Sequence, residues 1–176
     1  MSKGKYPVDL DTLKKFSLFN GLSDQELEMI AALVTIRKCK KGEIIIEEGQ
    51  PGDETYILLE GEVEVTQKLT LFASETRDLD KRDKMLIRLK ADFHPFVGEM
   101  SLFQENMKRS ATMAAIGEVK LGAINNRELL KLAVENKNIG FNLFYNIGLV
   151  LAARLKKANQ DIMKLTTAFS LALENG

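Results

Sequence analysis

The chain has 176 residues, 45% of them apolar and 28% charged, which is the composition of an ordinary globular domain. Lys+Arg and Asp+Glu are equal at 25 each, and the zero net charge argues against a protein that binds nucleic acid over a large basic face. A single cysteine, Cys39, excludes a disulfide within the chain and a cysteine-based metal cluster.

The sequence carries no sign of export or membrane insertion. The first 16 residues lack the apolar run of a secretory signal, and the most apolar stretch, 139–155, is too short and too interrupted by polar residues to cross a bilayer. We therefore expect a cytoplasmic protein. The only histidine, His94, lies beside Pro95, and we expect a loop residue there rather than a catalytic group or metal ligand, so no metal is predicted.

Two helices are predicted in residues 1–34. Residues 9–19 have the pattern of a short helix that ends near Asn20–Gly21. A second helix is expected from Ser23 to Val34, because apolar residues recur every three or four positions. Ser23 and Glu26 have capping-box spacing at its start.

Residues 35–125 have the pattern of short strands, with β-branched runs separated by glycine-containing turns. Residues 67–84 end in a block of alternating charges, which indicates either a long solvated hairpin or a partner-docking surface. A returning strand is expected at Met85–Leu89 and two more around Gly117. The order of helices, strands and helices predicts an antiparallel β-sandwich or barrel with helices gathered at one end.

The helical pattern returns in residues 126–176. A short helix is expected with Asn126 as its N-cap, followed by a proline-free helix over 141–174, about 34 residues and on the order of 50 Å long. Its apolar stripe consists of Ile147, Leu151, Leu155, Ala158, Ile162, Leu165 and Phe169. Such a helix projects beyond a small β-domain. The stripe then needs a cover, which is either a second copy in a homodimer or the chain's own domain if the helix folds back.

Residues 96–112, FVGEMSLFQENMKRSAT, place one acid and one base near a glycine in an otherwise small and apolar segment. Two interpretations are open: a Glu99–Arg109 ion pair, or a pocket for an anionic ligand. In a pocket, Gly98 lets the backbone approach a phosphate, and the N–H groups that open the next helical turn carry partial positive charge. Arg109 offers a planar fork that matches phosphate oxygens, whereas Glu99 suits a sugar hydroxyl.

Two blocks together resemble the cyclic-nucleotide-binding domain family. KGEIIIEEGQPGDETYILLEGEVEV is similar to the family's glycine-punctuated strands, and residues 96–112 resemble its phosphate-binding cassette. The resemblance covers about residues 13–165. It implies a mainly β fold with flanking helices (α+β), a β-jelly roll with N-terminal helices and a long C-terminal helix. The expected parts of this single domain are a helical segment 1–34, the jelly roll 35–125 and C-terminal helices 126–176.

The resemblance also implies a set of ligand-binding residues. In the cassette these are Gly98, Glu99, Met100, Ser101, Arg109, Ser110, Ala111 and Thr112. On the long helix, members of the family contact the adenine through a Thr-Ser pair. The matching positions here are Ala158, whose side chain cannot form hydrogen bonds, and Asn159, which is the predicted base contact. The implied ligand is cyclic AMP, with cyclic GMP as the alternative, because Ser110 does not decide between them.

The function implied by the resemblance is a regulatory sensor without enzymatic activity or cofactor. It would bind the cyclic nucleotide, form a homodimer, and relay the signal through its helix from about Phe141 to an unknown protein. No DNA-binding helix-turn-helix is visible, so direct DNA binding is not expected. Two alternatives remain open. One is a ligand-free jelly-roll structural or interaction protein that dimerises through the long helix, suggested by Ala158 and the altered link at 91–96. The other is a cupin-like enzyme, against which the single histidine argues.

Overall fold

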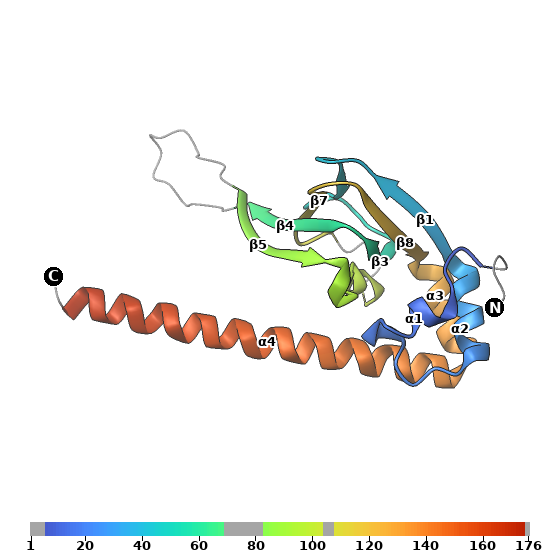
Figure 1. Ribbon diagram of the computed structural model, residues 1–176. Helices are drawn as coiled ribbons and strands as arrows, with labels where there is room; N and C mark the ends of the chain where they lie inside the picture. Colours follow the sequence, from blue (N-terminus) through green and yellow to red (C-terminus); the bar gives the residue numbers. More distant parts are fainter. Residues whose placement is uncertain (1–5, 69–82, 104–107, 175–176) are drawn as a thin grey trace.

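The computed structural model describes residues 6–68, 83–103 and 108–174, and these residues form two four-stranded antiparallel sheets with helices gathered at one end (Figure 1). The first sheet has the order β1 (Val34–Cys39), β8 (Val119–Asn125), β3 (Glu54–Glu60), β6 (Phe96–Val97). The second has the order β2 (Ile44–Ile46), β7 (Thr112–Ala115), β4 (Glu62–Lys68), β5 (Asp83–Lys90). Most neighbouring strands are distant in the sequence, which is typical of a sandwich. The predicted β-sandwich is confirmed.

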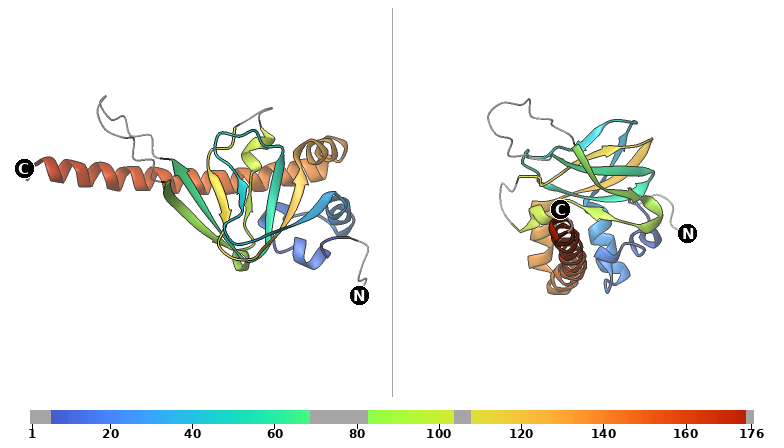
Figure 2. Two further views of the ribbon diagram at one scale, coloured as in Figure 1. Left: turned by 90° about the horizontal axis from the view of Figure 1, so that it is seen from above. Right: turned by 90° about the vertical axis from the view of Figure 1, so that its left-hand side faces the viewer.

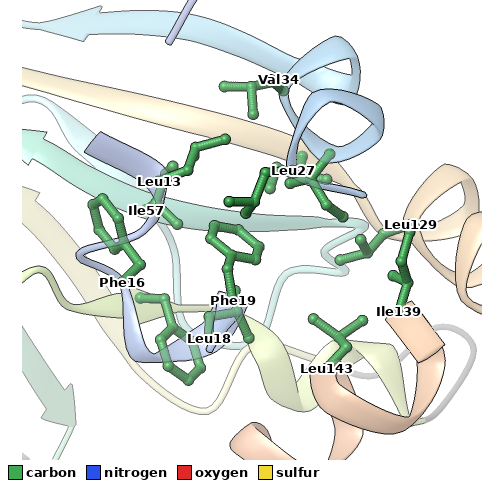
Figure 3. Packing of buried hydrophobic residues seen from close by; sticks show 14 of the residues in the cluster. Leu13, Phe16, Leu18, Phe19, Leu27, Val34, Ile57, Leu129, Ile139 and Leu143 are labelled. Carbon is green, nitrogen blue, oxygen red and sulfur yellow. The ribbon is translucent and has the colours of Figure 1, made fainter. Parts of the chain in front are cut away.

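The first sheet has an apolar core on each face. Between the sheets, Tyr56, Leu58 and Leu121 of the first sheet meet Val63 and Met113 of the second. The other face of the first sheet packs on the helices, and Figure 3 shows Phe16, Phe19, Leu27, Ile57, Leu129, Ile139 and Leu143 filling this space. Because alternate residues of a strand point to opposite faces, consecutive residues such as Ile57 and Leu58 serve the two cores.

The N-terminal region contains α1 (Leu10–Leu13), a 3₁₀ turn η1 (Ser17–Phe19) and α2 (Asp24–Leu33). The predicted capping box is confirmed, because the Ser23 N–H donates to the Glu26 carboxylate at 2.8 Å and the Ser23 hydroxyl accepts from the Glu26 N–H at 3.4 Å. The prediction of one helix over 9–19 is wrong. Phe16 adopts an extended conformation, and its ring is fully buried in the core, so burial outweighs local helix propensity.

Helix α3 (Asn126–Glu135) begins with Asn125, not Asn126, as its N-cap. The Asn125 side chain accepts hydrogen bonds from the backbone N–H groups of Arg127 and Glu128. The register explains the shift, since β8 pairs with β3 up to Asn125 opposite Glu54 and the chain turns there. Asn126 consequently lies inside the helix and is buried.

Helix α4 (Lys137–Glu174) is 38 residues long, about 57 Å at 1.5 Å per residue, and begins four residues before the predicted start. Its first turns are buried against the N-terminal region, where Asn146 donates to the carbonyls of Leu18 at 3.1 Å and Asn20 at 2.9 Å. Every residue from Ala152 to Leu173 is exposed. Figures 1 and 2 show α4 running past the sheets and projecting beyond them. In the described part of the chain, none of the helices has the length and hydropathy that a membrane span requires.

The apolar stripe predicted on α4 extends over both the buried first turns and the exposed remainder of the helix. Ile147 is buried and Leu151 partly buried, whereas the stripe residues from Leu155 to Phe169 are exposed. The projection expected from the sequence is therefore confirmed, and the domain itself covers only the first part of the stripe.

The predicted returning strand is confirmed, because Met85–Leu89 lies within β5. Residues 69–82, which hold most of the charged segment, lie outside the described residues. Strand β5 leads into a 3₁₀ turn, η2 (Ala91–Phe93), that ends at His94. As expected, His94 is a loop residue; its ring packs on Phe16 with ring centroids 5.4 Å apart.

Candidate functional site

Arg109 lies on the loop before β7 and turns its guanidinium into the domain. It donates to the Glu54 carbonyl at 2.7 Å, to the Ser101 hydroxyl at 3.3 Å and, more weakly, to the Gly98 carbonyl at 3.4 Å. All three acceptors are neutral. Arg109 has no ion pair with a carboxylate of the described residues. Within the described residues it is therefore a partly buried cation that forms no ion pair.

The surroundings of Arg109 compensate its charge only in part. Burial lowers the pKa of the Arg109 guanidinium, and the nearby carboxylates of Asp53, Glu54 and Glu99 offset this only partly. Burial, reinforced by a 2.6 Å hydrogen bond to Glu54, raises the pKa of the Tyr56 phenol to about 12, so Tyr56 stays neutral. Removing a charge from water even in part has a desolvation cost, and an anion that reached Arg109 would reduce that cost.

The turn between β2 and β3 fixes the position of Arg109. The Arg109 N–H donates to the Gln50 carbonyl at 2.8 Å, and the Gly49 N–H donates to the Arg109 carbonyl at 2.8 Å. Gly52 lies directly against the guanidinium, where a β-carbon would overlap the Arg109 Nε and Cζ atoms. Position 52 therefore needs glycine if Arg109 is to keep this orientation.

Gly98 opens the 3₁₀ turn η3 (Glu99–Leu102) in the left-handed conformation, with φ of 87°. A β-carbon at Gly98 would lie 2.7 Å from both Arg109 Nη1 and the Glu54 carbonyl oxygen. Both the backbone conformation and the close approach require glycine here. That Gly98 lets the backbone approach a phosphate stays a prediction.

Glu99 is 2% exposed and pairs with Arg154 of α4, which lies 55 residues further along the chain. Arg154 Nη1 donates to Glu99 Oε1 at 2.5 Å, and Arg154 Nη2 donates to the Phe96 carbonyl at 3.4 Å. The first interpretation of this segment, a Glu99–Arg109 ion pair, is therefore wrong, because Glu99 pairs with Arg154. Sequence reasoning did not assign any role to Arg154.

A cavity of about 140 Å³ lies between these groups. Seven of the nine predicted ligand-binding residues line it: Gly98, Glu99, Met100, Ser101, Arg109, Ser110 and Ala111. Lys108 and Arg154 add basic groups, and Ile46, Val65, Val97 and Met113 form an apolar wall. The lining of the cavity thus combines cations and hydrogen-bonding groups with apolar surface. This arrangement suits an anion that carries a flat, weakly polar group.

Two predicted residues stay outside the cavity. The Thr112 hydroxyl accepts a hydrogen bond from the Glu48 N–H at 3.1 Å, away from Ala111 and Met113, which line the cavity. Asn159 lies on the exposed half of α4 beside Leu155 and Met163. No three His, Cys, Asp or Glu side chains converge on a metal-binding arrangement within the described ranges.

The family described as cyclic nucleotide-binding domain matches residues 36–136. The match includes the strands of both sheets and the whole of residues 96–112, and it spans more than half of the chain. The chain belongs to this family, and the expected jelly roll with flanking helices is confirmed.

Three similar proteins illustrate the range of the family. The cAMP-dependent protein kinase regulatory subunit of Dictyostelium discoideum is 27% identical over 122 residues, which are 68% of this chain and 34% of that protein. A CRP-like cAMP-activated global transcriptional regulator of Mycobacterium tuberculosis is 22% identical over 155 residues, 88% of this chain and 62% of the regulator. The structure of Thermus thermophilus catabolite activator protein aligns with a TM-score of 0.69 and 25% identity over 85% of this chain and 63% of that one. The chain thus spans about a third of the kinase subunit's length.

Proposed function

We propose that this chain is a sensor that binds cyclic AMP in the cavity between Gly98–Ser101 and Arg109–Ala111. The observation that carries the proposal is the partly buried guanidinium of Arg109, whose acceptors among the described residues are neutral. The cyclic phosphate would supply the missing negative charge. The buried carboxylate of Glu99 is placed at the same cavity to accept a hydrogen bond from the ribose hydroxyl.

The apolar wall of the cavity favours adenine over guanine. Ile46, Val65 and Met113 can pack against any planar base but offer its polar edge no side-chain partner, and guanine has one more exocyclic polar group than adenine. Leaving such groups without hydrogen bonds is costly in a buried site. The kinase subunit and the transcriptional regulator described above are both named for cyclic AMP, which supports the same choice.

We further propose that the ligand repositions α4. The cavity, about 140 Å³, is smaller than the roughly 300–1,000 Å³ of typical ligand sites, and Arg154 of α4 forms part of its lining. A bound nucleotide therefore needs part of the space that the Arg154 side chain occupies. The ribose of the nucleotide would share the Glu99 carboxylate with Arg154. A ligand that changes the strength of the Glu99–Arg154 contact binds the two positions of α4 with unequal affinity, which is the condition for a relay.

Spin labels at two exposed positions, Glu118 of the jelly roll and Gln160 of α4, test the relay in chains whose buried Cys39 is replaced by alanine. Labelled chains are diluted with unlabelled ones so that only distances within a chain are measured. We expect saturating cyclic AMP to change the distance distribution, and Arg154→Ala to produce part of that change without ligand. Lys157→Ala, which removes another exposed cation of α4, serves as the control. An identical distribution with and without cyclic AMP would contradict the relay.

We also propose that the projecting half of α4 forms a homodimer. Leu155, Ile162, Leu165 and Phe169 are each more than half exposed and lie on one face of the helix. Such a stripe is stabilised when a second helix covers it. Light scattering is expected to give the mass of two chains, and Ile162→Glu to lower it toward one, while Gln160→Glu on another face has no effect. A wild-type mass of one chain at high micromolar concentration would rule the dimer out.

A further inference from the structure

Asn126, the first residue of α3, is 5% exposed and uses three of its polar groups within the domain. Its side-chain Oδ1 accepts from the hydroxyl of Thr55 at 2.8 Å, and its Nδ2 donates to the Ser101 hydroxyl at 2.7 Å. Its backbone N–H donates to the Asp53 carbonyl at 2.7 Å. One asparagine thus joins the start of β3 to the turn η3.

These partners are the groups that hold Arg109. The Ser101 hydroxyl accepts from Arg109 at 3.3 Å and donates to the Gly98 carbonyl at 2.6 Å, so together with the bond from Asn126 its hydrogen-bonding capacity is used. The shortest hydrogen bond of Arg109 goes to the Glu54 carbonyl, and the residues on either side of Glu54 both bind Asn126. The two main acceptors of the guanidinium are therefore fixed by a single residue.

We propose that Asn126 is a positioning residue for the anion-binding arginine. It holds Ser101 and the start of β3 at the spacing that keeps Arg109 in one orientation before any ligand enters. This inference rests on the proposed function, because its expected consequence is a change in the affinity for cyclic AMP. Capping of α3 does not account for the Asn126 side chain, because Asn125 performs that role.

The energetic reason lies in the burial of the partners. Thr55 is fully buried, so its hydroxyl loses its acceptor and cannot turn to water when Asn126 is shortened. A buried hydroxyl without a partner is costly, and the segment rearranges to find one. Any rearrangement of Thr55 or Ser101 moves an acceptor of Arg109, and small displacements of a site lose much of its binding.

The adjacent asparagines of α3 provide a matched pair of variants. Asn126→Ala is expected to weaken cyclic AMP binding by roughly tenfold, the effect of losing about one positioned hydrogen bond. Asn125→Ala is expected to lower the melting temperature, because it removes the helix cap, and to leave the affinity unchanged. Calorimetric titrations are made at a temperature at which both variants are folded. Equal affinity of Asn126→Ala and the wild type, or equal losses in both variants, would overturn the proposal.

A second measurement does not depend on the ligand and separates this inference from the proposed function. The Nε–H signal of Arg109 in the NMR spectrum of the free protein, assigned by its loss in Arg109→Lys, reports the orientation of the guanidinium. We expect this signal to shift in Asn126→Ala and to a smaller extent in Thr55→Val, and to be unchanged in Asn125→Ala. If the wild type fails to bind cyclic nucleotide, the proposed function fails, whereas an unmoved Arg109 signal in Asn126→Ala contradicts the positioning role itself.

Discussion

Replacing Arg109 with alanine is expected to weaken cyclic AMP binding by roughly 1.5–3 kcal/mol, which is about a 10- to 150-fold loss of affinity. The reason is that Arg109 is a partly buried cation in the lining of the cavity, and its acceptors among the described residues are neutral. The variant should remain folded, because the substitution also removes a partly buried charge that forms no ion pair with the described carboxylates. Isothermal titration and thermal unfolding, measured side by side, separate the two effects.

The matched control is Arg127→Ala, which removes an exposed arginine of α3 that does not line the cavity. Its affinity should equal that of the wild type. Arg109→Lys should fall between the two, because lysine keeps the charge but not the planar fork. Unchanged affinity of a folded Arg109→Ala protein would remove Arg109 from the binding site.

Replacing Gly52 with alanine is expected to reduce affinity by roughly tenfold or more, although the new methyl group never touches the ligand. The added β-carbon would overlap the guanidinium of Arg109, so the arginine must leave its position. Backbone strain does not contribute, since Gly52 is not among the residues with positive φ. The effect therefore reports the placement of Arg109 alone.

Gly117→Ala is the control for this variant, because a β-carbon at Gly117 meets no atom within 4 Å and its φ is not positive. Combining Gly52→Ala with Arg109→Ala should cost no more than Arg109→Ala by itself, since both changes remove the same interaction. Fully additive losses in the double variant would show that Gly52 acts by another route.

Features fixed by local sequence were predicted well. The Ser23–Glu26 capping box, the glycine-punctuated strands and the short segment from Gly98 to Ser101 depend on residues a few positions apart, and the structure contains all of them. The family resemblance supplied the overall arrangement and placed Arg109 at the cavity. What local pattern could not supply was the choice between Asn125 and Asn126 as the cap, which depends on how far β8 pairs with β3.

The contacts made by Arg154 and Asn126 depend on packing between distant segments. Arg154 reaches Glu99 because α4 lies along the domain at one rotation about its axis, and no local pattern sets that rotation. One signal was available, since Arg154 follows the buried Ile147 by seven residues, about two turns, and so shares its face. For Asn126 the signal was absent, because an asparagine at a helix start usually serves as a cap.

Strand and helix periodicity also explain why two of the predicted residues lie outside the cavity. Thr112 is the first residue of β7 and its neighbour Met113 lines the cavity, so strand alternation turns the Thr112 side chain away from it. Asn159 follows Arg154 by five residues, about 140° around the helix, and so faces elsewhere while Arg154 faces the cavity. The positions of both side chains follow from strand alternation and helix periodicity, which constrain individual residues more tightly than a family resemblance does.

The most direct test of the account is a calorimetric titration of the wild-type chain with cyclic AMP and, separately, cyclic GMP. We expect saturable binding of one nucleotide per chain, with cyclic AMP bound more tightly because guanine brings one more exocyclic polar group to the apolar wall of Ile46, Val65 and Met113. The absence of binding heat and of any thermal shift at millimolar concentrations of both nucleotides would contradict it. That result would favour instead a ligand-free protein that acts through the exposed half of α4.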